Sequence, residues 1–149
     1  MPPRNIVKYW VPVLVWMGLI FWMSTGMFSW NNSYHFLEQI LRSIRPTISR
    51  DSIIMINNGL RKAGHVTEYF ISGMLVFRAF RAGSREPRIL RWAILSCVFV
   101  VLLAASDEFH QSFVASRTAS VLDVGIDTAG GLLAICVSMM RQYRVGRQG

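Results

Sequence analysis

Three groups of polar side chains lie at or within apolar segments of the chain. The first is Lys62, His65, Glu68 and Tyr69; the second is Asp107, Glu108, His110 and Gln111; the third is Arg117, Asp123 and Asp127. Histidines and carboxylates transfer protons in general acid–base catalysis. Lysine and arginine bind phosphate and carboxylate groups, arginine through its planar fork. These residue types therefore predict acid–base chemistry, anion binding or both.

By residue type, the candidate catalytic residues are His65, Glu108, His110 and Asp123. The candidate ligand-binding residues are Lys62, Glu68, Asp107, Gln111, Arg117 and Asp127. Carboxylates outnumber cations in this set, so protons or a divalent ion must balance them. Zinc and manganese accept the side-chain types of His65, Asp107 and His110 as ligands. A divalent metal is therefore one alternative, and the cofactor stays open.

The elements that carry these residues are predicted to be membrane helices. Of 149 residues, 52% are hydrophobic and 16% are charged, with a mean hydropathy of +0.36. Soluble domains carry about a quarter charged residues. Segments 9–25, 63–80, 92–109 and 120–140 approach the roughly 20 apolar residues that a span requires. We predict an all-α integral membrane four-helix bundle that forms a single domain over residues 1–149. The alternative for the first segment is a signal peptide.

The positive charges predict the orientation of the bundle. Ten Lys and Arg residues and one acid lie in the N-terminal segment, the connection at 78–91 and the C-terminal tail. The segments expected on the opposite side of the membrane hold six Lys and Arg residues and seven acids. Because basic residues favour the cytoplasmic side, both termini are expected in the cytoplasm. The bias of basic residues toward the cytoplasmic side therefore explains the formal charge of +8. No nucleic-acid recognition motif accompanies it, and we expect no nucleic-acid partner.

Two further helices are expected between the first and second spans. Tyr34, Leu37, Leu41 and Ile44 recur at helical spacing, and Pro46 ends the run. This pattern predicts an amphipathic helix on the outer surface of the membrane. Residues 49–62 predict a second, short helix that leads into the second span, with Ser49 or Asp51 as its cap.

This topology places the polar residues of three helices on the outer side. One stripe of the second span comprises Lys62, His65, Glu68 and Ser72, and one stripe of the fourth comprises Ser120, Asp123, Asp127, Gly130, Gly131 and Ala134. On the third span, Asp107 and Gln111 share a face, with His110 beside them. Small residues permit close helix packing. A carboxylate near mid-membrane costs about 2.5–3.5 kcal/mol, so Glu68 and Asp127 are expected to face the bundle interior or a wet cavity.

Cys97 and Cys136 fall within apolar runs and are expected to be buried, free thiols.

Two sequence elements resemble the VanZ-like family, small bacterial membrane proteins named for a teicoplanin-resistance determinant. "RKAGHVTEY" matches the first family element through Lys62, His65 and Tyr69, and the resemblance adds Tyr69 to the candidate ligand-binding residues. "DEFHQSFVASRTASVLDVGIDTAGG" matches the second through Asp107, Glu108, His110, Gln111, Phe113, Arg117, Asp123 and Gly130. Ala115 and Ser116 stand where the family often has Pro-Gly, so a different turn before Arg117 is expected. The resemblance covers residues 60–140 and implies a multi-pass protein of the bacterial cytoplasmic membrane, without a defined reaction.

Three classes of function follow. In the first, an outer-face site acts on or shields an envelope lipid headgroup or a lipid-linked wall precursor, with tolerance to teicoplanin as an outcome. In the second, the protein is a membrane-embedded phosphatase, phosphotransferase or metal-assisted hydrolase. "SRTASVLDVGID" is similar to an element of type 2 phosphatidic acid phosphatases, but Asp123 stands in place of the nucleophilic histidine. In the third, cations and acids hold together a non-catalytic structural or partner-binding bundle. Neither the substrate nor the oligomeric state follows from the sequence.

Overall fold

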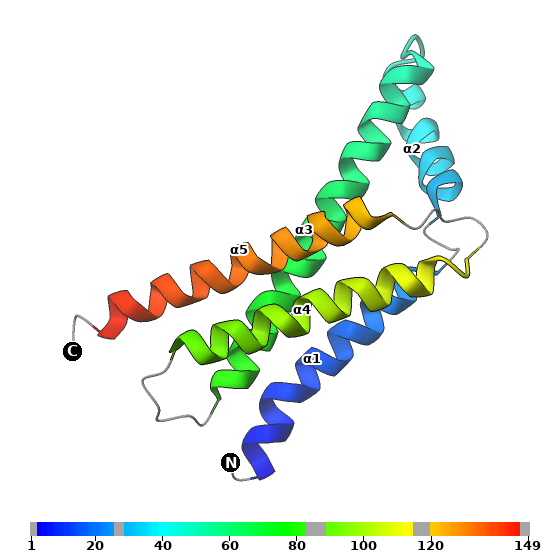
Figure 1. The fold of residues 1–149 in the computed structure, drawn as a ribbon. Coiled ribbons are helices and arrows are strands. Elements are labelled where there is room, and N and C mark those ends of the chain that lie inside the picture. The colour runs from blue at the N-terminus through cyan, green and yellow to red at the C-terminus, as the bar shows by residue number, and fades with distance from the viewer. Residues whose placement is uncertain (1–2, 26–28, 83–88, 115–119, 147–149) are drawn as a thin grey trace.

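The computed structural model describes residues 3–25, 29–82, 89–114 and 120–146. Within these ranges the chain forms five helices (Figure 1): α1 (Pro3–Met23), α2 (Trp30–Ile44), α3 (Arg50–Arg81), α4 (Ile89–Gln111) and α5 (Val121–Gly146). The predicted all-α class is confirmed. The segments expected at 9–25, 92–109 and 120–140 correspond to α1, α4 and α5, whose ends differ from the prediction by one to six residues.

The prediction of a separate short helix before the second span was wrong. One continuous helix, α3, covers both segments with 32 residues. At 1.5 Å per residue it is about 48 Å long, which exceeds the roughly 30 Å hydrocarbon core of a membrane. Gly59, Gly64 and Gly73 lie inside it, but each glycine costs only about 1 kcal/mol relative to alanine and no proline interrupts the helix. Ser49 caps α3, and its hydroxyl oxygen accepts a hydrogen bond from the Ser52 backbone N–H.

The first half of α3 pairs with α2 in a helical hairpin that extends beyond the other helices (Figure 1). Trp30 stacks on Tyr34 with 5.1 Å between ring centroids, and its indole N–H donates to the Asn58 side-chain oxygen at 2.8 Å. Tyr34 is buried, whereas Ile44 at the end of the predicted apolar face is 77% exposed. The hairpin therefore buries only part of the amphipathic face of α2.

Glycines allow α3, α4 and α5 to cross at close range. A Cβ atom added to Gly130 would lie 2.7 Å from the Val66 carbonyl oxygen, and one on Gly73 would meet the backbone of Gly131. A Cβ on Gly131 would meet the Val100 side chain. The predicted small-residue seam of the last span is therefore confirmed, since only glycine permits these backbone approaches.

The core surrounds this crossing. Its larger buried side chains are Ile20, Tyr69, Phe77, Val100, Leu103 and Ile135. Val13, Val76 and Ala79 form a second cluster between α1 and α3. The Trp16 indole also donates to the Glu68 carbonyl oxygen at 3.0 Å. These contacts join α1 to the same face of α3 that carries the polar stripe.

The outside of the bundle is apolar. Leu14, Leu102 and Leu133 are each more than half exposed. Among the described residues, the segments Ile89–Gln111 and Val121–Tyr143 are long and apolar enough to cross a membrane, and Val7–Met23 is a shorter apolar segment. Both cysteines are free, as expected, but Cys136 is exposed, so its predicted burial was wrong. Its side of α5 belongs to the apolar exterior.

Candidate functional site

The crossing of α3 and α5 brings His65 and Asp127 together. His65 Nδ1 lies 3.2 Å from Asp127 Oδ1 and 3.4 Å from Oδ2. Asp127 is 0% exposed, and His65 is half-buried. Val66, which follows His65, is the residue whose backbone rests on Gly130, one turn after Asp127. The glycine contact therefore sets the distance between the imidazole and the carboxylate.

Two cavities flank this pair. The first has a volume of about 150 Å³ and is lined by Met23, Ser24, Ser33, Arg61, Gly64, His65 and Glu68. The second has a volume of about 210 Å³ and is lined by Asn58, Arg61, Lys62, His65, Asp123, Ile126 and Asp127. Arg61 and His65 line both, so they form the wall between them. We refer to Arg61, Lys62, His65, Glu68, Asp123 and Asp127 as the α3–α5 cluster.

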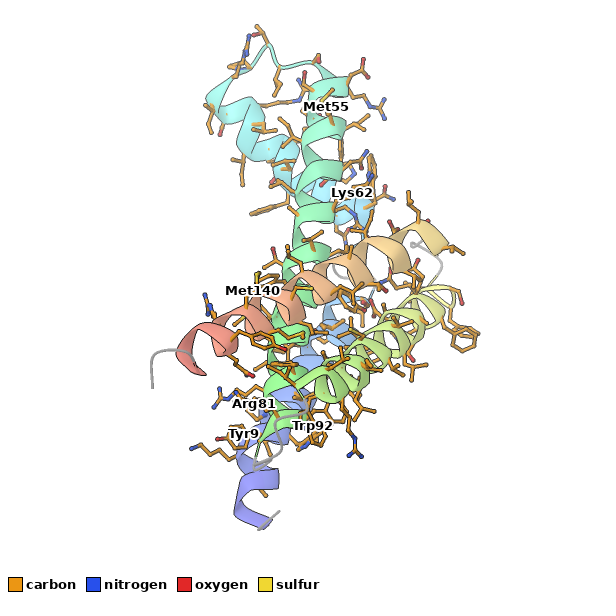
Figure 2. All side chains as sticks on the ribbon, turned by 60° about the vertical axis from the view of Figure 1, so that its left-hand side comes forward. Tyr9, Met55, Lys62, Arg81, Trp92 and Met140 are labelled. Atoms are coloured by element: carbon orange, nitrogen blue, oxygen red, sulfur yellow. The ribbon has the colours of Figure 1, made fainter. Side chains whose placement is uncertain are left out.

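The α3–α5 cluster mixes cations with carboxylates. Arg61 interacts electrostatically with Asp123 and Glu68. Lys62 is exposed on the stretch of α3 beside the crossing with α5 (Figure 2). Arginine and lysine donate hydrogen bonds to phosphate or carboxylate oxygens, and carboxylates accept them from hydroxyl or amine groups. The arrangement is therefore suited to a polar ligand that carries both an anion and hydrogen-bond donors.

A second polar group, the α1–α4 cluster, consists of Ser24, Asp107 and Gln111. The Ser24 hydroxyl donates to Asp107 Oδ1 at 2.5 Å, and the Gln111 amide donates to Oδ2 at 2.9 Å. The same amide lies 3.3 Å from the Ser24 hydroxyl oxygen. Asp107 is 1% exposed. Both of its carboxylate oxygens thus have partners, and the cluster connects α1 to α4.

Glu108 and His110 lie apart from the two cavities. Glu108 Oε1 accepts a hydrogen bond from the Ser120 backbone N–H at 2.5 Å, which places its carboxylate at the N-terminal end of α5. This position satisfies a backbone donor and complements the helix dipole. His110 contacts the Phe21 ring edge to face at 5.6 Å. Glu108 therefore connects α4 to the start of α5, and His110 packs α4 against α1.

Tyr69 lies in the core between the two clusters. It is fully buried, and its hydroxyl, although near Asp107, forms no hydrogen bond of good geometry within the described chain. Its backbone carbonyl oxygen also lies against Gly131. Tyr69 therefore belongs to the packing where α3, α4 and α5 meet.

The structure divides the predicted site into parts. Lys62, His65, Glu68, Asp123 and Asp127 line the cavities, while Asp107 and Gln111 belong to the α1–α4 cluster. Arg117 lies outside the described residues. The metal candidates His65, Asp107 and His110 do not form a metal site: within the described ranges no group of three or more His, Cys, Asp or Glu could hold a metal ion.

Sequence reasoning did not assign Arg61, Asn58, Ser24 and Ser33 to the site. Arg61 adjoins Lys62 in the sequence, and only the register of α3 shows that both reach a cavity. Ser24 ends an apolar segment and forms its hydrogen bond to a residue 83 positions away. No local pattern signals such a contact.

The protein-family comparison gives one match. A family model described as VanZ/LLP1 matches residues 9–142, a range that extends from α1 into α5. The comparisons with curated proteins and with solved structures gave no match.

Proposed function

The chain belongs to the VanZ/LLP1 family of membrane proteins, and from this premise we propose that its α3–α5 cluster binds the anionic headgroup of an envelope lipid or lipid-linked wall precursor. The protein acts on or shields that molecule at the outer face of the bacterial cytoplasmic membrane. Tolerance to glycopeptides such as teicoplanin is the proposed cellular outcome.

One observation carries this proposal. His65 is held by the buried Asp127 between two cavities, and Arg61 lines both. A positioned imidazole beside a guanidinium, with Lys62 on the same helix, supports binding of phosphate oxygens. Glu68 and Asp123 line the same cavities and favour a headgroup with hydroxyl or amine donors beside its phosphate.

The proposed topology has four spans, formed by α1, the second half of α3, α4 and α5. The two long apolar helices support α4 and α5 as spans, and the contacts of α1 and α3 with them support the other two. Both termini lie in the cytoplasm because the basic residues favour that side. The α2–α3 hairpin then extends from the outer surface and the cavities lie near its base.

Chemical labelling tests this topology. In a chain with Cys97 and Cys136 replaced by alanine, Thr47→Cys on the hairpin should react with an impermeant thiol reagent on intact cells. Arg141→Cys at the end of α5 should react only after the cells are permeabilised. Both native positions are exposed, so burial does not mask either label. Labelling of both cysteines on intact cells would contradict the proposed orientation.

The geometry also favours a second candidate, a membrane-embedded hydrolase or phosphotransferase. Because Nδ1 of His65 contacts Asp127, Nε2 is the ring nitrogen left to take a proton from water or a hydroxyl. A carboxylate that orients a histidine is the arrangement by which general bases are fixed in place. In this case the headgroup is hydrolysed or transferred at the same cavities.

A comparison of envelope lipids and wall precursors tests both candidates. Cells without the protein are complemented with the native chain, with His65→Gln or with His35→Gln, and their lipids and those bound to the purified protein are measured. His35 is exposed on α2 and provides a matched control. A new headgroup structure lost only in His65→Gln supports an enzyme. A precursor that co-purifies unchanged supports shielding. Unchanged profiles with no bound precursor would leave a structural bundle.

A further inference from the structure

The end of the bundle opposite the α2–α3 hairpin contains a cavity that the proposed function does not use and that is larger than the two cavities beside His65. It has a volume of about 480 Å³, lies between α1, α3 and α5, and its polar lining comprises Tyr9, Arg78, Arg81, Ser138, Arg141 and Gln142. Figure 2 shows Tyr9 and Arg81 together at the end of the molecule farthest from Met55. We refer to this space as the basic cavity.

Three arginines from two helices surround the basic cavity. Arg78 and Arg81 lie one turn apart at the end of α3, and Arg141 comes from α5. No carboxylate lines the cavity, and none of the ion pairs in the described residues involves these arginines. Of the eight acids in the chain, Glu86 lies outside the described ranges. The others lie in the α2–α3 hairpin, in the two polar clusters or, for Glu108, at the start of α5, and none of them lines the basic cavity.

The remaining lining also suits a ligand. The Arg78 guanidinium carbon lies 5.1 Å from the centroid of the Tyr9 ring, so the ring restrains this side chain. Gln142 Oε1 is buried without a hydrogen-bond partner among the described residues. Met74 and Phe77 supply an apolar wall. A group with phosphate oxygens, a hydroxyl donor and an apolar portion would satisfy all three features.

We propose that the basic cavity binds a phosphate group, carried either by an anionic phospholipid headgroup or by a soluble phosphate. The bias of basic residues toward the cytoplasm accounts for arginines at this end. It does not account for their convergence on one cavity from two helices. Basic pockets between membrane helices bind phospholipid headgroups through this chemistry. The inference is independent of the α3–α5 cluster, because the two sites share no residue.

Lipid titration of the purified full-length protein tests this site. Native mass spectrometry measures the binding of phosphatidylglycerol and of phosphatidylcholine to the native chain and to two triple variants. One variant carries Arg78→Gln, Arg81→Gln and Arg141→Gln. The matched control carries Arg42→Gln, Arg45→Gln and Arg50→Gln, which removes the same charge from exposed positions on the α2–α3 hairpin. Thermal unfolding verifies that each variant is folded.

We expect the native chain and the control to prefer phosphatidylglycerol. Each arginine is expected to contribute roughly fivefold, so the cavity variant should bind this lipid about a hundredfold more weakly. If inorganic phosphate binds the native chain and displaces the lipid, a soluble phosphate is a ligand; without displacement, the lipid headgroup is the ligand.

Absence of any preference in the native chain, or an equal loss in both triple variants, would overturn the proposal. If the cavity variant does not fold, Arg141→Gln alone replaces it. A loss of about fivefold is then expected, and unchanged binding would reject the site.

Discussion

The α3–α5 and α1–α4 clusters use the same kinds of residues and differ in what surrounds them. Asp107 receives hydrogen bonds from Ser24 and Gln111 at both of its oxygens, and these partners close the network. Asp127 is equally buried, but its partner His65 lines two cavities together with Arg61. A carboxylate whose partners are all internal stabilises a fold. A carboxylate that orients a side chain in a cavity also prepares that side chain for a ligand.

The polar residues can be interpreted as contacts that hold the helices together or as a binding site, and each interpretation fits one of the two clusters. The α1–α4 cluster fits the interpretation in which polar groups hold helices together, since it joins α1 to α4 through neutral donors. The α3–α5 cluster fits the interpretation as a site. Ser24 of the α1–α4 cluster also adjoins the α3–α5 cluster. Its hydroxyl binds Asp107, and Ser24 lines the smaller cavity. A ligand in that cavity therefore lies next to the hydrogen-bond network that fixes α1.

The largest effect is expected from Asp127→Lys. It replaces a fully buried acid with a cation beside His65 and Arg61, and an uncompensated buried charge costs about 3–5 kcal/mol. We predict that the variant fails to accumulate in the membrane, as measured by quantitative immunoblotting. Asp123→Lys is the control because Asp123 is only half-buried, and it should accumulate. Normal amounts of the Asp127 variant would show that this face of α5 is open to water.

A smaller effect is expected from Gly130→Ala, which tests the packing that brings His65 to Asp127. The added methyl group meets the Val66 carbonyl, and overpacking of this kind costs about 1–3 kcal/mol. Gly125→Ala is a matched control, since nothing lies within 4 Å of its added methyl group. Thermal unfolding in detergent should show a lower midpoint for Gly130→Ala and an equal or higher midpoint for Gly125→Ala. Equal midpoints for both variants would mean that the crossing has room to adjust.

The smallest effect is expected from Glu108→Gln. The side chain keeps an oxygen that can accept from the Ser120 N–H but loses its charge at the start of α5. Such a charge contributes about 0.3–1 kcal/mol. We predict a slightly lower unfolding midpoint and unchanged lipid binding, because Glu108 lines neither cavity. Loss of lipid binding at unchanged stability would instead place Glu108 in the site.

The sequence predicts where the helices lie better than it predicts which polar residues belong to which cluster. The stripe of Asp123, Asp127 and Gly130 follows from helical spacing alone and is confirmed in α5. The continuity of α3 was not predicted, because the second span was drawn from the apolar run that begins at residue 63, and residues 49–62 were assigned to a separate outer helix. The structure stabilises this segment by burying Asn57 and by the hydrogen bond from Trp30 to Asn58.

The separation into two clusters depends on contacts between distant segments. Asp107 faces Ser24 because of how α1 packs on α4, and the face that Asp107 shares with Gln111 is compatible with either cluster. Similarly, consecutive residues on a helix point about 100° apart, so the orientation of α3 determines how Arg61 and Lys62 reach the cavities. Helix periodicity fixes the faces of each helix but not which faces meet.

The most direct test compares Asp127→Asn with Asp107→Asn in one experiment that measures unfolding and co-purifying envelope lipid or precursor. Both substitutions preserve shape and remove one charge. We predict that Asp127→Asn remains near native stability and loses the bound molecule, because the amide no longer orients His65 as the carboxylate does. Asp107→Asn should lower the free energy of unfolding by about 1–3 kcal/mol, since its amide nitrogen cannot accept the hydrogen bond that the Ser24 hydroxyl or the Gln111 amide donates. The folded fraction of this variant should keep the bound lipid or precursor. Loss of stability in both variants with unchanged lipid content would contradict the account.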